Sequence, residues 1–161
     1  MTPCRRCARG FTLIELVIAV AIVGVLALLA TPLLEVTAQR HKETELRLAL
    51  RQIRSAIDAY HLAVKEQRIE SPHDASGYPP SLDVLADGVP DITQPDRRRI
   101  YFLRRLPRDP MHPDGTLPAA ETWGLRSYAS PPDAPAPGED VYDVHSLSDK
   151  TGLNGVPYRE W

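Results

Sequence analysis

Cysteine is almost absent from this chain of 161 residues, and the two that it has, Cys4 and Cys7, lie close to its N-terminus. A single C-x-x-C pair cannot supply the four ligands of a structural zinc site. If the N-terminal residues 1–10 are removed, the remaining chain has no thiol and cannot form a disulfide bond. The rest of the protein must then be held together by its apolar core, or by a bound metal ion.

The chain also lacks a strong excess of either charge and lacks the familiar catalytic motifs. Its formal net charge is −2 and charged residues make up 25%, so the composition does not indicate a nucleic-acid-binding protein. The cluster Arg97, Arg98 and Arg99 is short, and we interpret it as a solvated face. No H-E-x-x-H, G-x-S-x-G or phosphate-binding glycine loop occurs. We therefore predict neither an enzyme nor a nucleic-acid-binding protein.

Charged residues are missing altogether from positions 16–34, a stretch long enough to cross a bilayer as a helix. Glu15 stands directly before this stretch, and because a charge there is costly in lipid, we expect it to have a partner or a function. Arg5, Arg6 and Arg9 come first, and positive residues beside a membrane helix tend to stay cytoplasmic. The pattern predicts a single-pass membrane protein with residues from Glu35 onward outside the cytoplasm.

The run from Gly10 to Glu15 resembles the class III signal of type IV pilins and of type II secretion pseudopilins. The resemblance implies that residues 1–10 are a leader, that a prepilin peptidase cuts between Gly10 and Phe11, and that Phe11 becomes N-methylated. It also implies that Glu15 guides subunits into a helical filament. An ordinary secretory signal peptide fits poorly, because the apolar region is too long and a small-residue cleavage site would have to follow it. A plain signal anchor is the remaining alternative.

A long helix is predicted to continue past the apolar stretch. Pro32 marks either a kink or a simple boundary between a transmembrane and assembly part, residues 11–34, and a periplasmic part, residues 35–70. In the second part, apolar residues recur at alternating steps of four and three, which places them in one stripe along a helix: Leu46, Leu50, Ile53, Ile57, Tyr60 and Val64. We expect this stripe to pack on the rest of the chain, since a coiled coil would need more heptads.

Residues 71–161 are predicted to form a periplasmic globular region. Ser81 is expected to cap a short helix through Leu85, which Gly88 ends. Residues 125–129 and 140–147 are expected to be strands, joined by an exposed proline-rich loop at 131–138. The predicted fold class is α+β and pilin-like: a long N-terminal helix, with a transmembrane half and an amphipathic half, packed on a small antiparallel sheet.

Motifs in the second half of the chain resemble those of the major, G-type pseudopilin of type II secretion. They lie at residues 78–82, 106–110, 123–128 and 143–147. One departure is an insertion, residues 111–122, between an Asp-Pro and a Trp-Gly that the family usually joins directly. The insertion favours a specialised or divergent member.

The G-type resemblance also implies that calcium binds in a loop after the last strand, here residues 146–155. The ligands implied are the side chain of Asp149, the carbonyl of Leu147, and the side-chain oxygens of Ser146 or Asn154. The family's second aspartate is missing, and Lys150 adds a positive charge beside the site. An ordinary turn rich in glycine and asparagine explains the same residues, so both interpretations stay open.

These observations predict a pseudopilin subunit that polymerises into a periplasmic pseudopilus and drives protein export by type II secretion. The expected partners are the prepilin peptidase, further copies of the chain, minor pseudopilins and the assembly platform of the bacterial inner membrane. Three alternatives remain open: a type IV pilin of a surface fibre, a minor tip pseudopilin, and a membrane-tethered binding module.

Overall fold

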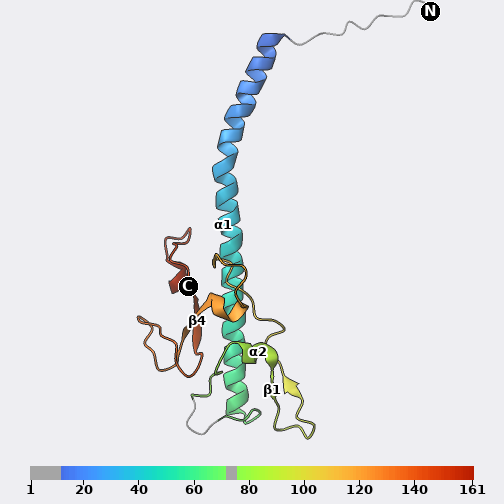
Figure 1. Ribbon diagram of the computed structural model, residues 1–161, viewed down its shortest axis with the longest axis vertical. Helices are drawn as coiled ribbons and strands as arrows, with labels where there is room; N and C mark the ends of the chain where they lie inside the picture. Colours follow the sequence, from blue (N-terminus) through green and yellow to red (C-terminus); the bar gives the residue numbers. More distant parts are fainter. Residues whose placement is uncertain (1–11, 72–75) are drawn as a thin grey trace, which may run out of the picture. The chain divides into compact units, whose positions relative to one another are not determined.

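The computed structural model describes residues 12–71 and 76–161, with the side chains of residues 27–33 outside the description. Its main element is one helix, α1 (Leu13–Lys65), which confirms the predicted long helix and does not end at Pro32 (Figure 1). The chain divides into two compact units, Met1–Gln39 and Arg40–Trp161. Each unit therefore contains a part of α1.

In the first unit, the described part of α1 carries mainly apolar side chains, and these are exposed on every face of the helix. The most exposed of these apolar side chains are Leu13, Ile14, Leu34, Val23 and Val20, with between 63% and 83% of their surface accessible. Within the part of the chain that the structure describes, no helical stretch has both the length and the hydropathy of a membrane span.

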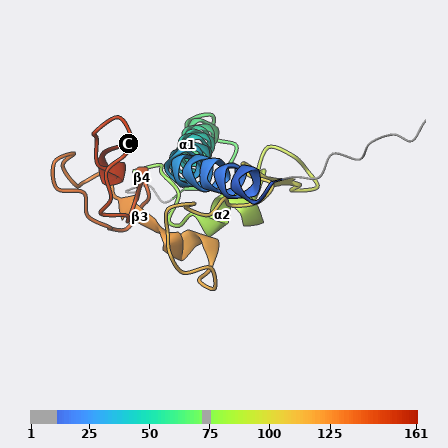
Figure 2. The ribbon, with the colours of Figure 1, turned by 90° about the horizontal axis from the view of Figure 1, so that it is seen from above.

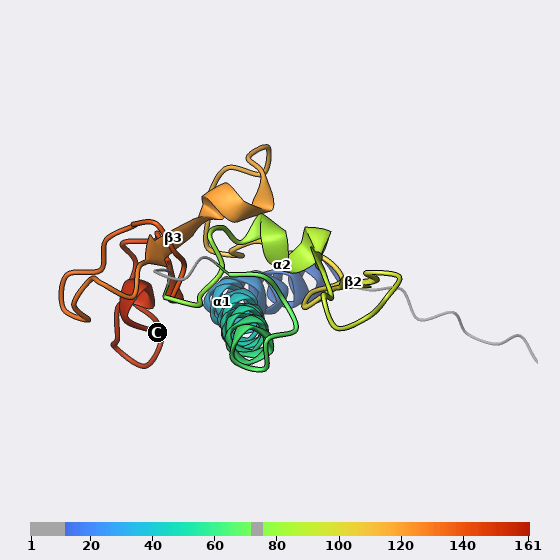
Figure 3. The ribbon, with the colours of Figure 1, turned by 90° about the horizontal axis from the view of Figure 1, so that it is seen from below.

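In the second unit, the amphipathic stripe of α1 forms the centre of the core. The predicted positions Leu46, Leu50, Ile53, Ile57 and Tyr60 are all buried, and Val64 is half-buried against them. Views along the helix show α2 and β3 on the same side of α1 (Figures 2 and 3). Arg51, Asp58 and Leu62 remain exposed. The prediction that the stripe packs on its own domain is confirmed.

The rest of the chain contributes buried apolar side chains that pack against this stripe. They come from short segments that are separated along the chain. The buried residues are Ile69, Leu82, Leu85, Leu103, Leu106, Trp123, Val141, Val144 and Tyr158. None of the strands in the described part of the chain is longer than four residues. Burial against α1 is therefore the main hydrophobic contribution that keeps these segments in place.

A short helix, α2 (Asp83–Asp87), lies where one was predicted, but its start differs from the prediction. The predicted cap at Ser81 is wrong: the residue before the helix is Leu82, which has helical backbone angles and makes no side-chain cap. Leu82 and Leu85 are both buried, so packing sets the start of this helix. Its end at Gly88 is confirmed, with φ at +74°, a conformation that favours glycine.

Two small antiparallel sheets replace the single predicted sheet. One pairs β1 (Val89–Pro90) with β2 (Arg99–Ile100), which the sequence analysis did not predict. The other pairs β3 (Trp123–Arg126) with β4 (Asp143–Ser146), in a register that places Trp123 opposite Ser146. The second pair confirms the two predicted strands with shifted bounds. The strand stops at Arg126 because the next amide, on Ser127, donates to Ala136 O of the proline-rich loop, 2.9 Å away.

The register of β3 and β4 places Gly124 opposite His145. A Cβ atom on Gly124 would lie 2.2 Å from Nε2 of His145, so the imidazole occupies the space beside the glycine. Burial lowers the pKa of His145, with a nearby aspartate, Asp143, acting in the opposite direction. A side chain at position 124 would therefore have to displace the His145 imidazole.

Two of the connecting segments are solvent-exposed. Residues 131–139 are exposed, which confirms the predicted proline-rich loop, and Arg97 to Arg99 are exposed as a solvated face. The predicted insertion, residues 111–122, contains the short 3₁₀ helix η1 (Ala119–Thr122). Arg108 closes it by donating to Leu117 O and to Asp114 O. A second 3₁₀ helix, η2 (Tyr158–Glu160), ends the described elements.

Asp91 joins the end of α1 to the β1–β2 connection. Its carboxylate accepts hydrogen bonds from the hydroxyl and amide of Thr93, at 2.5 and 3.0 Å, and from Arg68 Nη2 at 3.1 Å. These bonds, the Thr93 hydroxyl first among them, lower the pKa of Asp91. The Ile92 amide also donates to Arg68 O, so the link has a backbone component.

We predict that Asp91 stabilises the fold in a pH-dependent manner. Because its pKa is lower in the folded state, its contribution is present above the ordinary carboxyl pKa of about 4 and disappears as the pH falls through the folded pKa. Asp91→Asn should therefore unfold at a lower temperature than the wild type at neutral pH, with the difference shrinking in acid. Thermal melts across this range test this, with the exposed Asp87→Asn as control. A difference that does not change with pH would contradict it.

Candidate functional site

The start of α1 holds the first set of predicted functional residues. The helix begins at Leu13, and the preceding Thr12 acts as its N-cap, since Thr12 Oγ1 accepts a hydrogen bond from the Glu15 amide at 3.3 Å. Glu15 lies in the first turn, and its side chain is exposed. A carboxylate at this position interacts favourably with the positive end of the helix dipole. The sequence signal for the cap was the spacing Thr-x-x-Glu.

Gly10 and Phe11, the predicted cleavage pair, lie outside the described residues. The structure therefore places Glu15 but not the predicted cleavage point. Around and beyond Glu15, the exposed apolar side chains of α1 form a surface that an isolated soluble protein rarely presents. Such a surface indicates contact with a membrane or with other protein chains.

The second set of predicted residues lies in the C-terminal segment, by which we mean residues 147–161. This segment folds back on itself through a bridge between Thr151 and Pro157. The Gly152 amide donates to Val156 O, and the Gly155 amide donates to Gly152 O, both at 2.9 Å. Gly155 has φ at +80°, which this tight turn requires. The segment is therefore a closed turn followed by η2.

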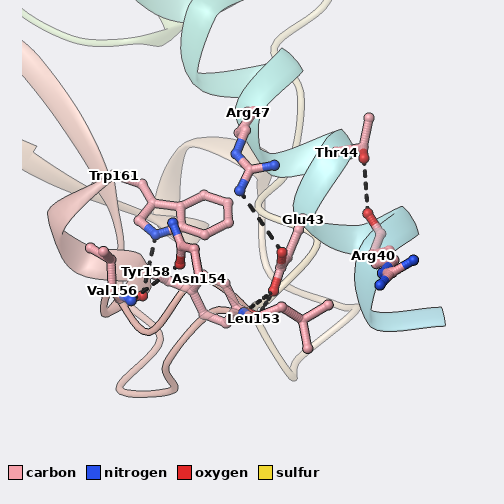
Figure 4. Close-up of polar contacts among 9 residues, drawn as sticks. All are labelled: Arg40, Glu43, Thr44, Arg47, Leu153, Asn154, Val156, Tyr158 and Trp161. Carbon is pink, nitrogen blue, oxygen red and sulfur yellow. Dashed lines mark hydrogen bonds and ion pairs between the residues drawn. The ribbon is translucent and has the colours of Figure 1, made fainter. Parts of the chain in front are cut away.

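Glu43 of α1 holds this segment from the helix side (Figure 4). Its side chain is buried, and its Oε1 accepts hydrogen bonds from the Leu153 amide at 2.7 Å and from the Tyr158 hydroxyl at 2.9 Å. Oε2 lies 3.9 Å from Arg47 Nη2, one helical turn away. The guanidinium of Arg47 in turn lies 4.1 Å from the ring centroid of Trp161. Four side chains thus connect the helix to the C-terminal segment.

Arg54 makes a second connection about three helical turns after Glu43 on α1. Its Nε donates to Asp143 Oδ1 at 2.7 Å, while Nη2 donates to Val144 O at 3.1 Å and Trp161 O at 2.8 Å. The sequence analysis missed both Glu43 and Arg54. Glu43 could have been found, because it stands three residues before Leu46 and so continues the apolar stripe with a charged residue.

The four residues of the predicted calcium site are placed as follows. The hydroxyl of Ser146 is buried and donates to Asp109 Oδ2 at 2.5 Å. The side-chain oxygen of Asn154 accepts the Val156 amide at 3.1 Å. Leu147 and Asp149 are exposed.

Calcium needs six to eight oxygen ligands around one point. Two of the four candidate oxygens are engaged within the protein, and Asp149 is the one carboxylate in residues 146–155. No group of three His, Cys, Asp or Glu side chains placed to hold a metal ion occurs among the described residues. The donor set therefore does not fit a calcium cage in this arrangement, and calcium stays a prediction from the resemblance.

Comparisons with known proteins address the N-terminal signal first. Residues 5–31 match the family model described as the prokaryotic N-terminal methylation motif. This range includes Gly10, Phe11 and Glu15, the residues on which the resemblance to pilins and pseudopilins rests.

Similarity to curated proteins extends over most of the chain. The type II secretion system core protein G of Klebsiella michiganensis is 29% identical over 140 residues, covering 84% of this chain and 91% of the relative. The protein of the same name from Dickeya chrysanthemi is 28% identical over 155 residues, covering 91% and 94%. That of Pectobacterium carotovorum subsp. carotovorum is 31% identical over 113 residues, covering 68% and 65%. No solved structure matches the chain. The methylation motif and the three relatives together support the identification of the chain as a G-type pseudopilin of type II secretion.

Proposed function

We propose that this pseudopilin is cut between Gly10 and Phe11 by a prepilin peptidase, is methylated on Phe11, and then polymerises into a pseudopilus. The observation that carries the proposal is the methylation motif over residues 5–31, within which the α-helix α1 begins at Leu13. After such a cut, Phe11 would be the first residue, one position before the N-cap Thr12.

In the assembled filament, Glu15 would pair with the N-terminal amine of Phe11 in a neighbouring subunit. The Glu15 carboxylate is exposed in the first turn of α1, among exposed apolar side chains that other subunits and lipid would cover. Once covered, a lone charge is unfavourable by several kcal/mol, and an opposite charge at hydrogen-bonding distance removes most of this penalty. The pair would therefore set the axial position of one subunit against the next.

The proposal also assigns the parts of the chain to the membrane and the periplasm. Residues 11–34 anchor the subunit in the bacterial inner membrane, and residues from 35 onward lie in the periplasm. Minor pseudopilins and the inner-membrane assembly platform would be further partners. The role is structural rather than enzymatic: growth of the filament would drive protein export by type II secretion.

Replacing the cleavage-site glycine should block processing. We predict that the wild-type chain from native membranes begins at Phe11 with an added methyl group, whereas Gly10→Val retains its leader because a β-branched side chain obstructs the peptidase. Intact mass and N-terminal sequencing measure both. Ala8→Val, which introduces the same side chain two positions earlier, should be processed normally. Efficient cleavage of Gly10→Val would refute the assigned cleavage point.

Replacing Glu15 should leave processing intact and prevent assembly. Glu15→Ala leaves the neighbouring amine unpaired when it becomes buried, a loss of about 3–5 kcal/mol per contact. Crosslinking between subunits and secretion of an exported protein should both fall to near background, while the mass still shows a chain that begins at Phe11. Glu35→Ala, at the next acidic residue of the same helix, is the matched control. Wild-type levels of assembly in Glu15→Ala would eliminate the proposed pair.

A further inference from the structure

The structure suggests how the C-terminal segment is held in place. The segment contacts α1 through hydrogen-bond donors: the Leu153 amide and the Tyr158 hydroxyl both point to Glu43 Oε1, at 2.7 and 2.9 Å. A calcium site would instead require the segment to present oxygen atoms that converge on the cation. The contact is thus built to receive an anion, and the helix supplies one.

The charge of that anion is compensated within the same unit. Arg47 lies 3.9 Å from Glu43 Oε2 and stacks over Trp161, so one guanidinium contacts both the buried carboxylate and the end of the segment. Tyr158 and Trp161 also contact each other edge to face, with centroids 5.0 Å apart. A buried, hydrogen-bonded and paired carboxylate satisfies the conditions under which burial of a charge is tolerated.

The interior of the turn is filled by protein atoms. A Cβ on Gly152 would lie 2.5 Å from Trp161 Cζ2, 2.8 Å from Asn154 Oδ1 and 3.2 Å from Tyr158 Cε1. The Asn154 oxygen is held in this packing by the Val156 amide. Two of the four oxygens that would have to converge on a cation, those of Ser146 and Asn154, are therefore fixed in other contacts.

We infer that Glu43 acts as an internal anchor of the C-terminal segment and performs the ordering role for which the family resemblance would require calcium. The order of residues 147–161 then depends on Glu43 and is independent of calcium. This inference concerns the folded domain alone and does not rest on the proposed roles of Gly10, Phe11 and Glu15.

Hydrogen exchange followed by mass spectrometry on the full chain in detergent tests this inference. Protection of the peptide containing Leu153 is measured with excess calcium, with excess magnesium and with EDTA. Wild-type protection should be the same in all three conditions. Glu43→Ala should speed exchange of the Leu153 amide by roughly tenfold or more, because a hydrogen bond to a charged group is lost. Glu45→Gln, an exposed carboxylate on the same helix, should leave exchange unchanged.

Two results would overturn the inference. The first is wild-type protection that falls in EDTA and returns with calcium but not with magnesium, which would show that a metal orders the segment. This comparison needs no variant, so it stands even if Glu43→Ala folds poorly. The second is wild-type protection of the Leu153 peptide in Glu43→Ala, which would show that the carboxylate is not the anchor.

Discussion

The packing of one apolar stripe on α1 is the constraint on which the rest of the second unit depends. Leu46, Ile53 and Ile57 are almost completely buried, and every other core segment is short. A two-stranded sheet of two or four residues has too few hydrogen bonds and too little apolar area to persist alone in water. The helix therefore acts as the template, and the segments that follow it gain their order by covering its stripe.

Polar contacts then fix the position of the segments that the apolar core leaves adjustable. Arg68 with Asp91 holds the connection that follows α1, Arg54 holds β4, and Glu43 holds the C-terminal segment. Apolar packing is tolerant of small shifts, whereas hydrogen bonds to charged groups lose strength steeply with distance and angle. These residues give the domain its defined arrangement, while the stripe supplies most of its cohesion.

The features that the sequence predicted correctly depend mainly on residues that lie close together in the chain. The stripe was predictable because its spacing is local and regular, and Gly88 was predictable because a helix end commonly needs a positive φ. The α+β class and the paired strands near Leu125 and Val144 were also correct. The Ser81 cap was wrong because core packing of Leu82 outweighed local capping preference.

The contacts that the sequence did not predict join residues far apart in the chain. β1 and β2 are too short to leave a pattern, and Arg54 resembles any other charged residue on a helix. At the N-terminus, the motif indicated Glu15 directly, whereas the Thr12 cap next to it was overlooked. The family signal lies in consecutive residues, whereas the partners of Glu43 in the C-terminal segment lie 110 and 115 positions further along the chain.

The separation between Glu43 and its partners has a consequence for the order of folding. Leu153 and Tyr158 lie 110 and 115 positions further along the chain than the carboxylate they bind. The helix can form as soon as its own residues are available, but this contact cannot form until synthesis has passed Tyr158. Closing so long a loop is entropically unfavourable and slow compared with helix formation. During that interval, the Glu43 side chain stays hydrated, and the domain reaches its final packing only as a late, long-range event.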